Sequence, residues 1–261
     1  MIDIHNHILH GLDDGAQDFE TSVKMARAAI ENGITHVVCT PHCNDHHPFD
    51  PGVNRERVAA LQDAVGSELI LGLGCDFHLS FDNIEDHFRN PGKYTINNKQ
   101  YLLVEFQESF IPHQLTDVLY RMIAGGVVPI ITHPERNDTL SAHPERMTDW
   151  LDAGCLIQLT AASIVGRWGK PIEAVSRRFL ADNWVHIVAS DAHNLSSRTF
   201  LMREAHARLV ELLDEETADR LCIRNPRAVF YGDPMPDQPE IKGAAGSAQQ
   251  KGILKRFLSR G

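Results

Sequence analysis

The sequence predicts an α/β fold built around a parallel β-sheet. Seven apolar runs rich in β-branched residues are spread along the 261-residue chain, and segments with helical periodicity separate most of them. Strands that are apolar along their whole length are buried on both faces, which is typical of parallel sheets covered by helices. These patterns do not distinguish a closed barrel from an open, doubly wound sheet.

The predicted strands follow one another along the chain. They occupy residues 2–5, 34–40, 69–75, 101–106, 127–133, 156–161 and 185–190. A helix over 18–33 is indicated by an Asp18 N-cap and a closing Gly33, and a second helix over 144–154 runs from a proline to a glycine. Asn97 and Asn98 lie between two extended runs, a pattern that predicts a hairpin just before the fourth strand.

Composition and charge restrict the class of protein. No run of roughly 18 apolar residues is present, and the N-terminus lacks the basic and then apolar order of a signal peptide, so we expect a cytoplasmic protein. The five cysteines form no C-x-x-C pair, which indicates reduced thiols and argues against a disulfide framework or a zinc knuckle. A net charge of -10 argues against nonspecific binding of nucleic acid.

Histidines and carboxylates stand at or just beyond the ends of six of the seven predicted strands. His5 and His7 are two residues apart, so a strand would point both side chains to the same face. The other such residues are His42, Asp76, Glu105, His133, Asp191 and His193. The carboxyl ends of parallel strands form one rim, where the active sites of α/β folds are built. The sequence therefore predicts a metal site with several ions at this rim.

The residue types of this set favour phosphate chemistry. Histidines and carboxylates without a thiolate bind manganese, iron(II) or zinc rather than copper(I) or an iron–sulfur cluster. Clustered divalent ions lower the pKa of bound water and stabilise charge on the attacking and leaving oxygens in phosphoryl transfer. Arg136 and Arg198 follow the histidines on the same rim, and the planar fork of arginine suits phosphate oxygens. Each arginine could instead be a solvated surface residue.

Six short motifs carry a resemblance to a known family. They are DIHNH (3–7), LDDG (12–15), TPH (40–42), VEF (104–106), THPER (132–136) and ASDAHN (189–194). With these motifs the chain resembles the PHP superfamily, and within it the CpsB/YwqE-like bacterial manganese-dependent protein-tyrosine phosphatases of capsule and exopolysaccharide clusters. The resemblance implies a distorted seven-stranded, TIM-like β/α barrel, a trinuclear metal centre, and dephosphorylation of a tyrosine autokinase.

The resemblance also implies a set of metal ligands. Carried over by motif, they are His5, His7, Asp14, His42, Asp76, Glu105, His133, Asp191 and His193. Glu105 is the expected bridge between two ions. The family usually has glutamate where this chain has Asp76, and aspartate is one methylene shorter. Either the backbone lies closer to the metal there or His78 contributes instead. Asp14 could also belong to a simple Asp-Gly turn.

Cysteine-based phosphatase chemistry is not supported by this chain. It needs a low-pKa cysteine in the pattern C-x-x-x-x-x-R, and none of the five cysteines fits that pattern. Cys39, Cys75 and Cys155 lie in or beside apolar strands and are expected to be small core residues. No general acid is evident, which favours phenolic esters, whose leaving group has a pKa of about 10. Phe49 and Trp168, in long rim loops, could pack on a tyrosine ring or anchor their loops.

Beyond residue 231 the composition changes. Residues 232–252 are rich in Pro, Gly, Ala and Gln, a composition that predicts a flexible linker. We therefore expect a phosphatase domain of residues 1–231, followed by a linker and a short tail over residues 232–261. Near the end, one helical face can gather the apolar residues Ile253, Leu254, Phe257 and Leu258, opposite the basic residues Lys255, Arg256 and Arg260. Such a helix suits an anionic membrane or a partner's groove. Because the segment is short, a disordered or barrel-packed tail is the alternative.

The expected partner is a phosphotyrosine protein, and the resemblance implies a membrane-associated bacterial tyrosine kinase. Three other functions remain open. A PHP phosphatase acting on a small molecule such as histidinol phosphate would use the same metals and arginines. A noncatalytic metal-binding subunit would keep the fold. Such a protein would be expected to have lost some of the metal ligands, however, and this chain has the full set. A PHP nuclease is disfavoured by the acidic chain.

Overall fold

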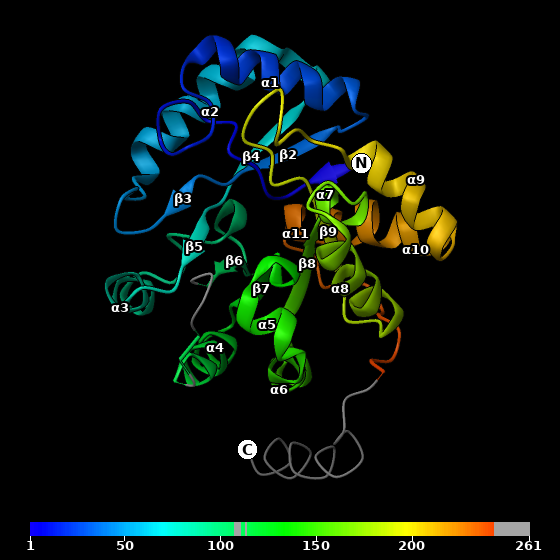
Figure 1. The fold of residues 1–261 in the computed structure, drawn as a ribbon. Coiled ribbons are helices and arrows are strands. Elements are labelled where there is room, and N and C mark those ends of the chain that lie inside the picture. The colour runs from blue at the N-terminus through cyan, green and yellow to red at the C-terminus, as the bar shows by residue number, and fades with distance from the viewer. Residues whose placement is uncertain (107–110, 113, 243–261) are drawn as a thin grey trace.

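The computed structural model describes residues 1–106, 111–112 and 114–242. Its strands lie in the middle of a ring of helices (Figure 1), and the described strand pairs are all parallel. The strands are β1 Ile2–Asp3, β2 His36–Cys39, β3 His42–Cys43, β4 Ile70–Leu73, β5 Asp76–His78, β6 Tyr101–Glu105, β7 Val128–Thr132, β8 Leu156–Thr160 and β9 Ile187–Ala189. Each lies within or directly after one of the predicted runs.

The second and third predicted strands are each interrupted once. β2 and β3 form the second, with Pro41 near the break, and β4 and β5 form the third. Cys39 lies opposite Leu73 and His42 opposite Asp76, so one register continues across the interruption. Proline has no N–H to donate to a ladder, but the Pro41 carbonyl accepts from Asp76 N at 3.1 Å. The two strands therefore stay together, and seven strand paths result.

These seven strand paths close into a barrel between the first and the last. Asn6 and Ala192 form a parallel bridge just beyond β1 and β9. Nearby, the buried carboxylate of Asp3 accepts hydrogen bonds from the backbone N and the Oγ of Ser190, at 2.8 and 2.6 Å. The closed but interrupted barrel confirms the predicted distorted β/α barrel.

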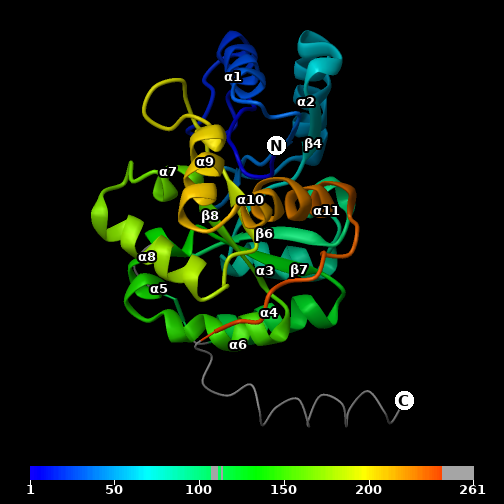
Figure 2. The ribbon, with the colours of Figure 1, turned by 90° about the vertical axis from the view of Figure 1, so that its right-hand side faces the viewer.

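Helices surround the barrel (Figures 1 and 2). They are α1 Phe19–Glu31, α2 Pro51–Val65, α3 Phe81–Arg89, α4 Leu115–Ala124, α5 Asp138–Ala142, α6 Thr148–Ala153, α7 Ala161–Ile164, α8 Lys170–Ala181, α9 Met202–Leu212, α10 Glu215–Asp219 and α11 Asn225–Tyr231. α1 begins at its predicted cap, because the Asp18 side chain accepts from Thr21 N at 2.7 Å. The predicted helix over 144–154 is a 3-10 turn, Pro144–Met147, continued by α6.

Alternation along the strands separates the inside of the barrel from its outside. Leu103 and Ile130 belong to a buried apolar cluster that gathers side chains from strands around the barrel. Val104 and Ile131, one position further along, belong to the larger apolar core that includes helix residues. Side chains two residues apart share a face of a strand. Glu105 therefore follows Leu103 on the inner face, at the carboxyl end of β6.

The predicted hairpin before β6 is wrong. The chain there forms a 3-10 helix, Ile96–Asn98, in which Asn97 has a φ of 52°. Asparagine adopts this left-handed conformation more readily than most residues. Its Oδ1 accepts from Leu73 N at 3.0 Å, and its Nδ2 donates to Phe230 O at 2.8 Å. Asn97, which the sequence pattern placed in a hairpin turn, instead links β4 to α11 through these two hydrogen bonds.

Residues 232–242, the described part of the predicted linker, lie along the barrel. Gln238 and Asn225 exchange hydrogen bonds through their side-chain amides, and the Lys242 carbonyl accepts from Trp184 Nε1 at 2.9 Å. The predicted amphipathic tail lies outside the described residues. Of the helices that the structure describes, none is long and apolar enough to cross a membrane.

Candidate metal centre

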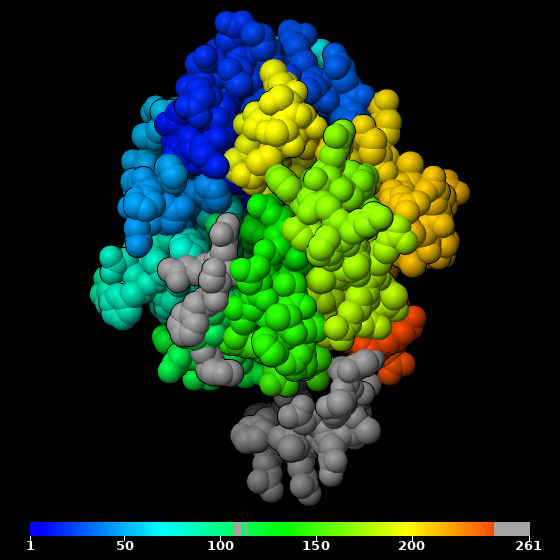
Figure 3. All heavy atoms as spheres, viewed as in Figure 1, coloured from blue at the N-terminus to red at the C-terminus, as the bar shows by residue number. Residues whose placement is uncertain are grey.

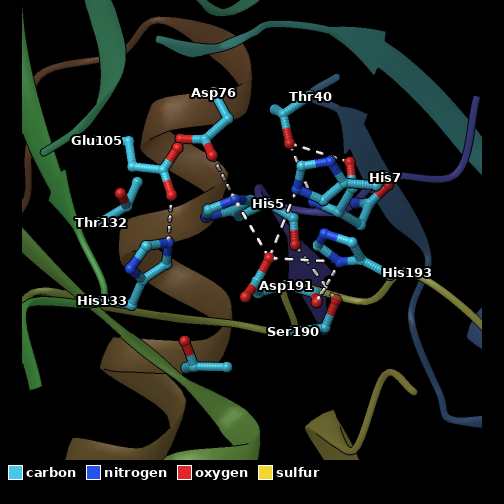
Figure 4. A network of polar contacts seen from close by, with 12 residues as sticks. His5, His7, Thr40, Asp76, Glu105, Thr132, His133, Ser190, Asp191 and His193 are labelled. Atoms are coloured by element: carbon cyan, nitrogen blue, oxygen red, sulfur yellow. Dashed lines mark hydrogen bonds and ion pairs between the residues drawn. The ribbon is translucent and has the colours of Figure 1, made fainter. Parts of the chain in front are cut away.

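The side chains predicted as metal ligands lie together at the carboxyl ends of the strands. In Figure 3 the blue segment that follows β1 lies beside the yellow segment that follows β9. Figure 4 shows His5 between Asp76 on one side and Asp191 on the other. Among the described residues, three overlapping groups have ligand atoms within 4.8 Å of one another: His7, Asp14, His42 and His193; His5, His7 and Asp76; and His42, Asp76 and Glu105.

His5 and His7 follow β1 and face the same carboxylate. The Nε2 of His5 lies 3.5 Å from Asp76 Oδ2 and 3.6 Å from Asp191 Oδ1. The Nε2 of His7 lies 3.5 Å from the same Asp191 oxygen. Both rings are buried. The spacing of two residues therefore brings both histidines to one point at the end of the strand.

The Asp14 carboxylate joins two histidines from distant parts of the chain. Its Oδ1 lies 3.3 Å from His193 Nε2 and 3.5 Å from His42 Nε2. The Asp-Gly turn considered from the sequence is also present, because Asp13 Oδ1 accepts from Gly15 N at 2.9 Å. The turn and the contact with the histidines are thus compatible, since the turn brings Asp14 to the cluster.

Asp76 occupies the cluster, whereas His78 does not. Asp76 is completely buried, and its Oδ2 lies 3.1 Å from His42 Nδ1. His78, two residues further along β5, is only partly buried and belongs to none of the three groups. Of the two candidates for the third strand, the geometry favours Asp76.

Glu105 and His133 form the edge of the cluster beside β6 and β7. Glu105 Oε2 lies 3.5 Å from His42 Nδ1, and its Oε1 lies 3.6 Å from His133 Nε2. Two oxygens that face different histidines are the arrangement expected of a bridging carboxylate. His133 and Asp191 have positive φ angles of 33° and 53°. Such backbone conformations are strained in residues other than glycine, and they gather at functional sites.

Several buried atoms of this cluster have no hydrogen-bond partner within the described residues. They are His5 Nε2, His7 Nε2, His42 Nδ1, His193 Nε2 and both carboxylate oxygens of Asp76. An unpaired buried donor or acceptor costs roughly 1–3 kcal/mol, so a group of them indicates a shared partner. Imidazole nitrogens and carboxylate oxygens around one space suit divalent cations. The residues present therefore fit a metal centre.

In three of these histidines, the Nδ1 of the ring is hydrogen-bonded to another group of the protein. The contacts are His5 Nδ1 to Gln158 Oε1 (2.9 Å), His7 Nδ1 to Asp13 Oδ2 (2.7 Å) and His193 Nδ1 to Asp191 O (2.9 Å). An acceptor at Nδ1 keeps the proton on that nitrogen, so that Nε2 presents the lone pair that can bind a metal. All three rings are thereby oriented with Nε2 toward the cluster.

Asp13 and Gln158 are not among the predicted site residues. Asp13 lies in the LDDG motif directly before the predicted Asp14. Gln158 is a polar residue inside the apolar strand β8, and buried polar groups of this kind need a partner. Gly15 completes the same motif, since a Cβ at this position would lie 2.1 Å from His7 O. The doubled aspartate and the lone glutamine are the sequence signals for these supporting residues.

The carboxylates favour positive charge in the cluster. Burial opposes the charged form of His5, but the charges of Asp76 and Asp191 outweigh burial and raise the His5 pKa to about 9. At the edge, burial and the Arg136 charge lower the pKa of His133 to about 3. Neutral imidazole is the form that binds a metal. A divalent cation would balance the carboxylates without protonating the histidines.

Arg136 and Arg198 reach the cluster through Asp191. Both donate to Asp191 Oδ2, Arg198 from Nη2 at 2.7 Å and Arg136 from Nη1. Arg198 Nη1 also lies 3.8 Å from Asp14 Oδ2. Only 24% of each arginine side chain is exposed, so neither is a solvated surface residue. The guanidinium of Arg136 also lies over Trp168, 5.3 Å from the ring centroid.

Phe49 and the five cysteines are part of the buried apolar core. Phe49 is buried, with its ring centroid 5.6 Å from that of Tyr94, so it anchors its loop. The five cysteines are all buried. This agrees with the core role predicted for Cys39, Cys75 and Cys155.

Both the sequence and the fold have known relatives. A family model described as capsular polysaccharide synthesis, CpsB/CapC, matches residues 1–231. Tyrosine-protein phosphatase YwqE of Bacillus subtilis (strain 168) is 32% identical over 253 residues, which cover 90% of this chain and 96% of that protein. Tyrosine-protein phosphatase CpsB of Streptococcus pneumoniae is 29% identical over 239 residues, which cover 88% of this chain and 98% of that protein.

A solved structure shares the whole architecture. It comes from work described as crystal structures of YwqE from Bacillus subtilis and CpsB from Streptococcus pneumoniae, unique metal-dependent tyrosine phosphatases. Its TM-score is 0.87 at 31% identity, and the match covers 93% of this chain and 99% of the solved chain. The barrel described above is therefore the fold of these relatives.

Proposed function

Because this chain belongs to the CpsB/CapC family of capsular polysaccharide synthesis, we propose that it is a metal-dependent protein-tyrosine phosphatase. Its relatives YwqE and CpsB are named tyrosine-protein phosphatases and are described as metal-dependent. The observation that carries the proposal is the set of buried, unpaired atoms on His5, His7, His42, His193 and Asp76. This set suits divalent cations, and two arginines that suit phosphate stand beside it.

Three divalent ions are proposed to bind at the cluster. Their proposed ligands are His5, His7, Asp14, His42, Asp76, Glu105, His133, Asp191 and His193. The three donor groups support more than one ion, and they overlap at His7, His42 and Asp76. Of these three residues only the Asp76 carboxylate, with two oxygens, is suited to being shared between ions. The mixture of nitrogen and oxygen donors suits manganese, and iron or zinc would also accept it. Bound ions would lower the pKa of water and offset negative charge on the phosphoryl oxygens.

Arg136 and Arg198 are proposed to hold the outer oxygens of the phosphate. Asp191 already fixes both guanidinium groups, so their positive charge is in place before a substrate binds. Charge arranged in advance stabilises a transition state because no reorganisation is needed during the reaction. The planar fork of arginine also offers paired donors to phosphate oxygens.

A phenolic ester is the substrate class that suits this site best. The phenol of tyrosine has a pKa of about 10, far below that of an alkyl alcohol, so it leaves readily as the anion. Hydrolysis of such an ester needs little help from a general acid. Phosphoserine, whose leaving group is an alkoxide, should be turned over poorly even when it binds.

The proposed phosphotyrosine protein is a bacterial tyrosine autokinase of capsule or exopolysaccharide synthesis. Two findings support it: the family description names capsular polysaccharide synthesis, and the relatives are named tyrosine phosphatases. A kinase at a membrane would also give a role to the basic and apolar residues near the C-terminus, which suit peripheral membrane contact.

Two peptides that differ only in carrying phosphotyrosine or phosphoserine test the substrate class, with histidinol phosphate as a third substrate. Release of inorganic phosphate is followed with metal-loaded enzyme. We expect kcat/KM to be highest for the phosphotyrosine peptide. Similar values for the two peptides, or a preference for histidinol phosphate, would indicate a general or small-molecule phosphatase.

A further inference from the structure

We propose that Trp168 is the aromatic surface against which the phenyl ring of the substrate packs. The inference rests on the proposed function and adds the group that recognises the ring. The proposed ligands and the two arginines are polar or charged, so they recognise phosphate and not the apolar part of tyrosine. An apolar surface next to them would add binding of the aryl ring to the preference that the phenolic leaving group already confers.

Trp168 lies beside Arg136, in the turn between α7 and α8. The Cζ of Arg136 is 5.3 Å from the centroid of the indole. The ring is only partly buried and packs on the edge of the apolar core. Its Nε1 is buried and has no hydrogen-bond partner in the part of the chain that the structure describes. Part of the indole therefore stays open to a ligand.

The turn holds the indole in a fixed position. Arg167 N donates to Ala162 O at 2.9 Å, and Gly169 N donates to Gly166 O at 3.1 Å. Gly166 and Gly169 have φ angles of 76° and 90°, which side-chain-bearing residues rarely adopt. Two glycines in this conformation, with the bonds between them, set the direction in which Trp168 projects. A surface prepared in this way loses little conformational freedom when a ligand binds.

Arg136 connects the indole to the metal cluster. Its guanidinium donates to Asp191, and Asp191 Oδ1 lies 3.5 Å from His7 Nε2. A phosphate held between Arg136 and the ions would therefore have the indole as a neighbour on the Arg136 side. The guanidinium of Arg136 lies over one face of the indole, so an ester group that extends in that direction meets the part of the ring that the guanidinium leaves uncovered. Packing of two aromatic rings, offset or edge to face, changes affinity by roughly three- to tenfold.

Two phosphonates separate recognition of the ring from recognition of the phosphate. Phenylphosphonate and methylphosphonate carry the same charged group, and neither has an ester bond to hydrolyse. Their inhibition constants are measured against p-nitrophenyl phosphate on the metal-loaded wild type, Trp168→Ala and Trp168→Phe. Tyr231→Ala is the control, because Tyr231 is an aromatic residue with 44% exposure on α11, away from the rim.

Trp168→Ala should weaken phenylphosphonate roughly three- to tenfold more than methylphosphonate, and Trp168→Phe should recover most of the loss. Tyr231→Ala should match the wild type. Equal weakening of both inhibitors would mean that Trp168 only supports Arg136, and no weakening would mean that the ring binds elsewhere. Either result overturns the proposal.

Two further outcomes are distinguishable from these. If Trp168→Ala does not fold, Trp168→Leu keeps an apolar side chain without a ring and gives the same comparison. If the wild type does not hydrolyse p-nitrophenyl phosphate, the proposed function is rejected. Calorimetric titration of the two phosphonates onto the wild type and Trp168→Leu then still decides the role of the indole. The wild type must prefer phenylphosphonate, and the variant without a ring must lose most of that preference.

Discussion

Arg198 donates a hydrogen bond to Asp191, with 2.7 Å between Nη2 and Oδ2. The other carboxylate oxygen, Oδ1, lies 3.5 Å from His7 Nε2. One oxygen of this aspartate therefore faces the arginines, and the other faces the histidine cluster. The arrangement brings fixed positive charge next to the proposed ions, where a phosphate would need it.

Arg136→Ala should lower kcat/KM for p-nitrophenyl phosphate by about a hundredfold, because it removes a charge that stabilises the transition state. Bound metal should remain, since the arginine is not a proposed ligand. Steady-state kinetics and elemental analysis on the same preparation measure both quantities. Arg27→Ala, an exposed arginine on α1, is the matched control. Near-normal kcat/KM in Arg136→Ala would show that this arginine does not hold the phosphate.

Asp13→Asn should weaken metal binding roughly 10- to 100-fold while the protein stays folded. The Asp13 carboxylate bonds His7 Nδ1 at 2.7 Å, and a carboxylate in this position makes the opposite ring nitrogen a better ligand. Titration calorimetry with manganese on metal-free protein measures the change. Asp63→Asn, an exposed aspartate on α2, should bind like the wild type. Unchanged affinity in Asp13→Asn would remove Asp13 from the support of the site.

Iodoacetamide should leave the activity of the folded enzyme intact. The five cysteines are buried, and burial raises the pKa of Cys155 and Cys222 to about 12. Thiols in this state react slowly. Phosphatase activity and mass spectrometry after treatment are the measurements, with attention to Cys43, which adjoins the proposed ligand His42. Loss of activity on alkylation with the metal still bound would point to a cysteine nucleophile.

Stability should fall in acid through His186. Burial lowers its pKa from 6.5 to about 4, and its Nδ1 accepts from Ile157 N at 3.2 Å, which requires the neutral ring. Between these two pH values the unfolded chain binds a proton that the folded protein does not. The free energy of unfolding therefore decreases as the pH falls, by up to about 1.4 kcal/mol per pH unit.

Urea unfolding at several pH values between about 7 and 4 measures this dependence. Chelator in every sample keeps the release of metal from contributing. His186→Gln should show a shallower decrease than the wild type, whereas His143→Gln should not, because 65% of the His143 side chain is exposed. Equal slopes for His186→Gln and the wild type would contradict the prediction.

The rim position of the cluster could be predicted because parallel strands impose it. His5, His42, Glu105 and His133 were each recognisable as polar residues at the end of an apolar run, and the carboxyl ends of such strands meet. The choice between Asp76 and His78 needed coordinates. Both lie on one strand, and only the path of β5 decides which of them reaches His42.

Contacts between distant segments could not be read from local patterns. Asn97 looked like a hairpin residue because asparagine favours positive φ, but its amide bonds Leu73 and Phe230. The pairing of Arg136 with Asp191 likewise depends on how β7 and β9 are placed around the barrel. In each case the residue type was informative, and its partner was not local in the sequence.

Metal dependence of phosphotyrosine hydrolysis is the most direct test of this account. The purified protein is dialysed against a chelator, and manganese is then restored. Phosphate release from a phosphotyrosine peptide and metal content by elemental analysis are both measured before dialysis, after dialysis and after manganese is restored. The account predicts that turnover disappears with the ions and returns as they rebind, because the proposed role of His5, His7 and Asp76 is to hold ions that would lower the pKa of the attacking water. Full turnover by metal-free protein would contradict it.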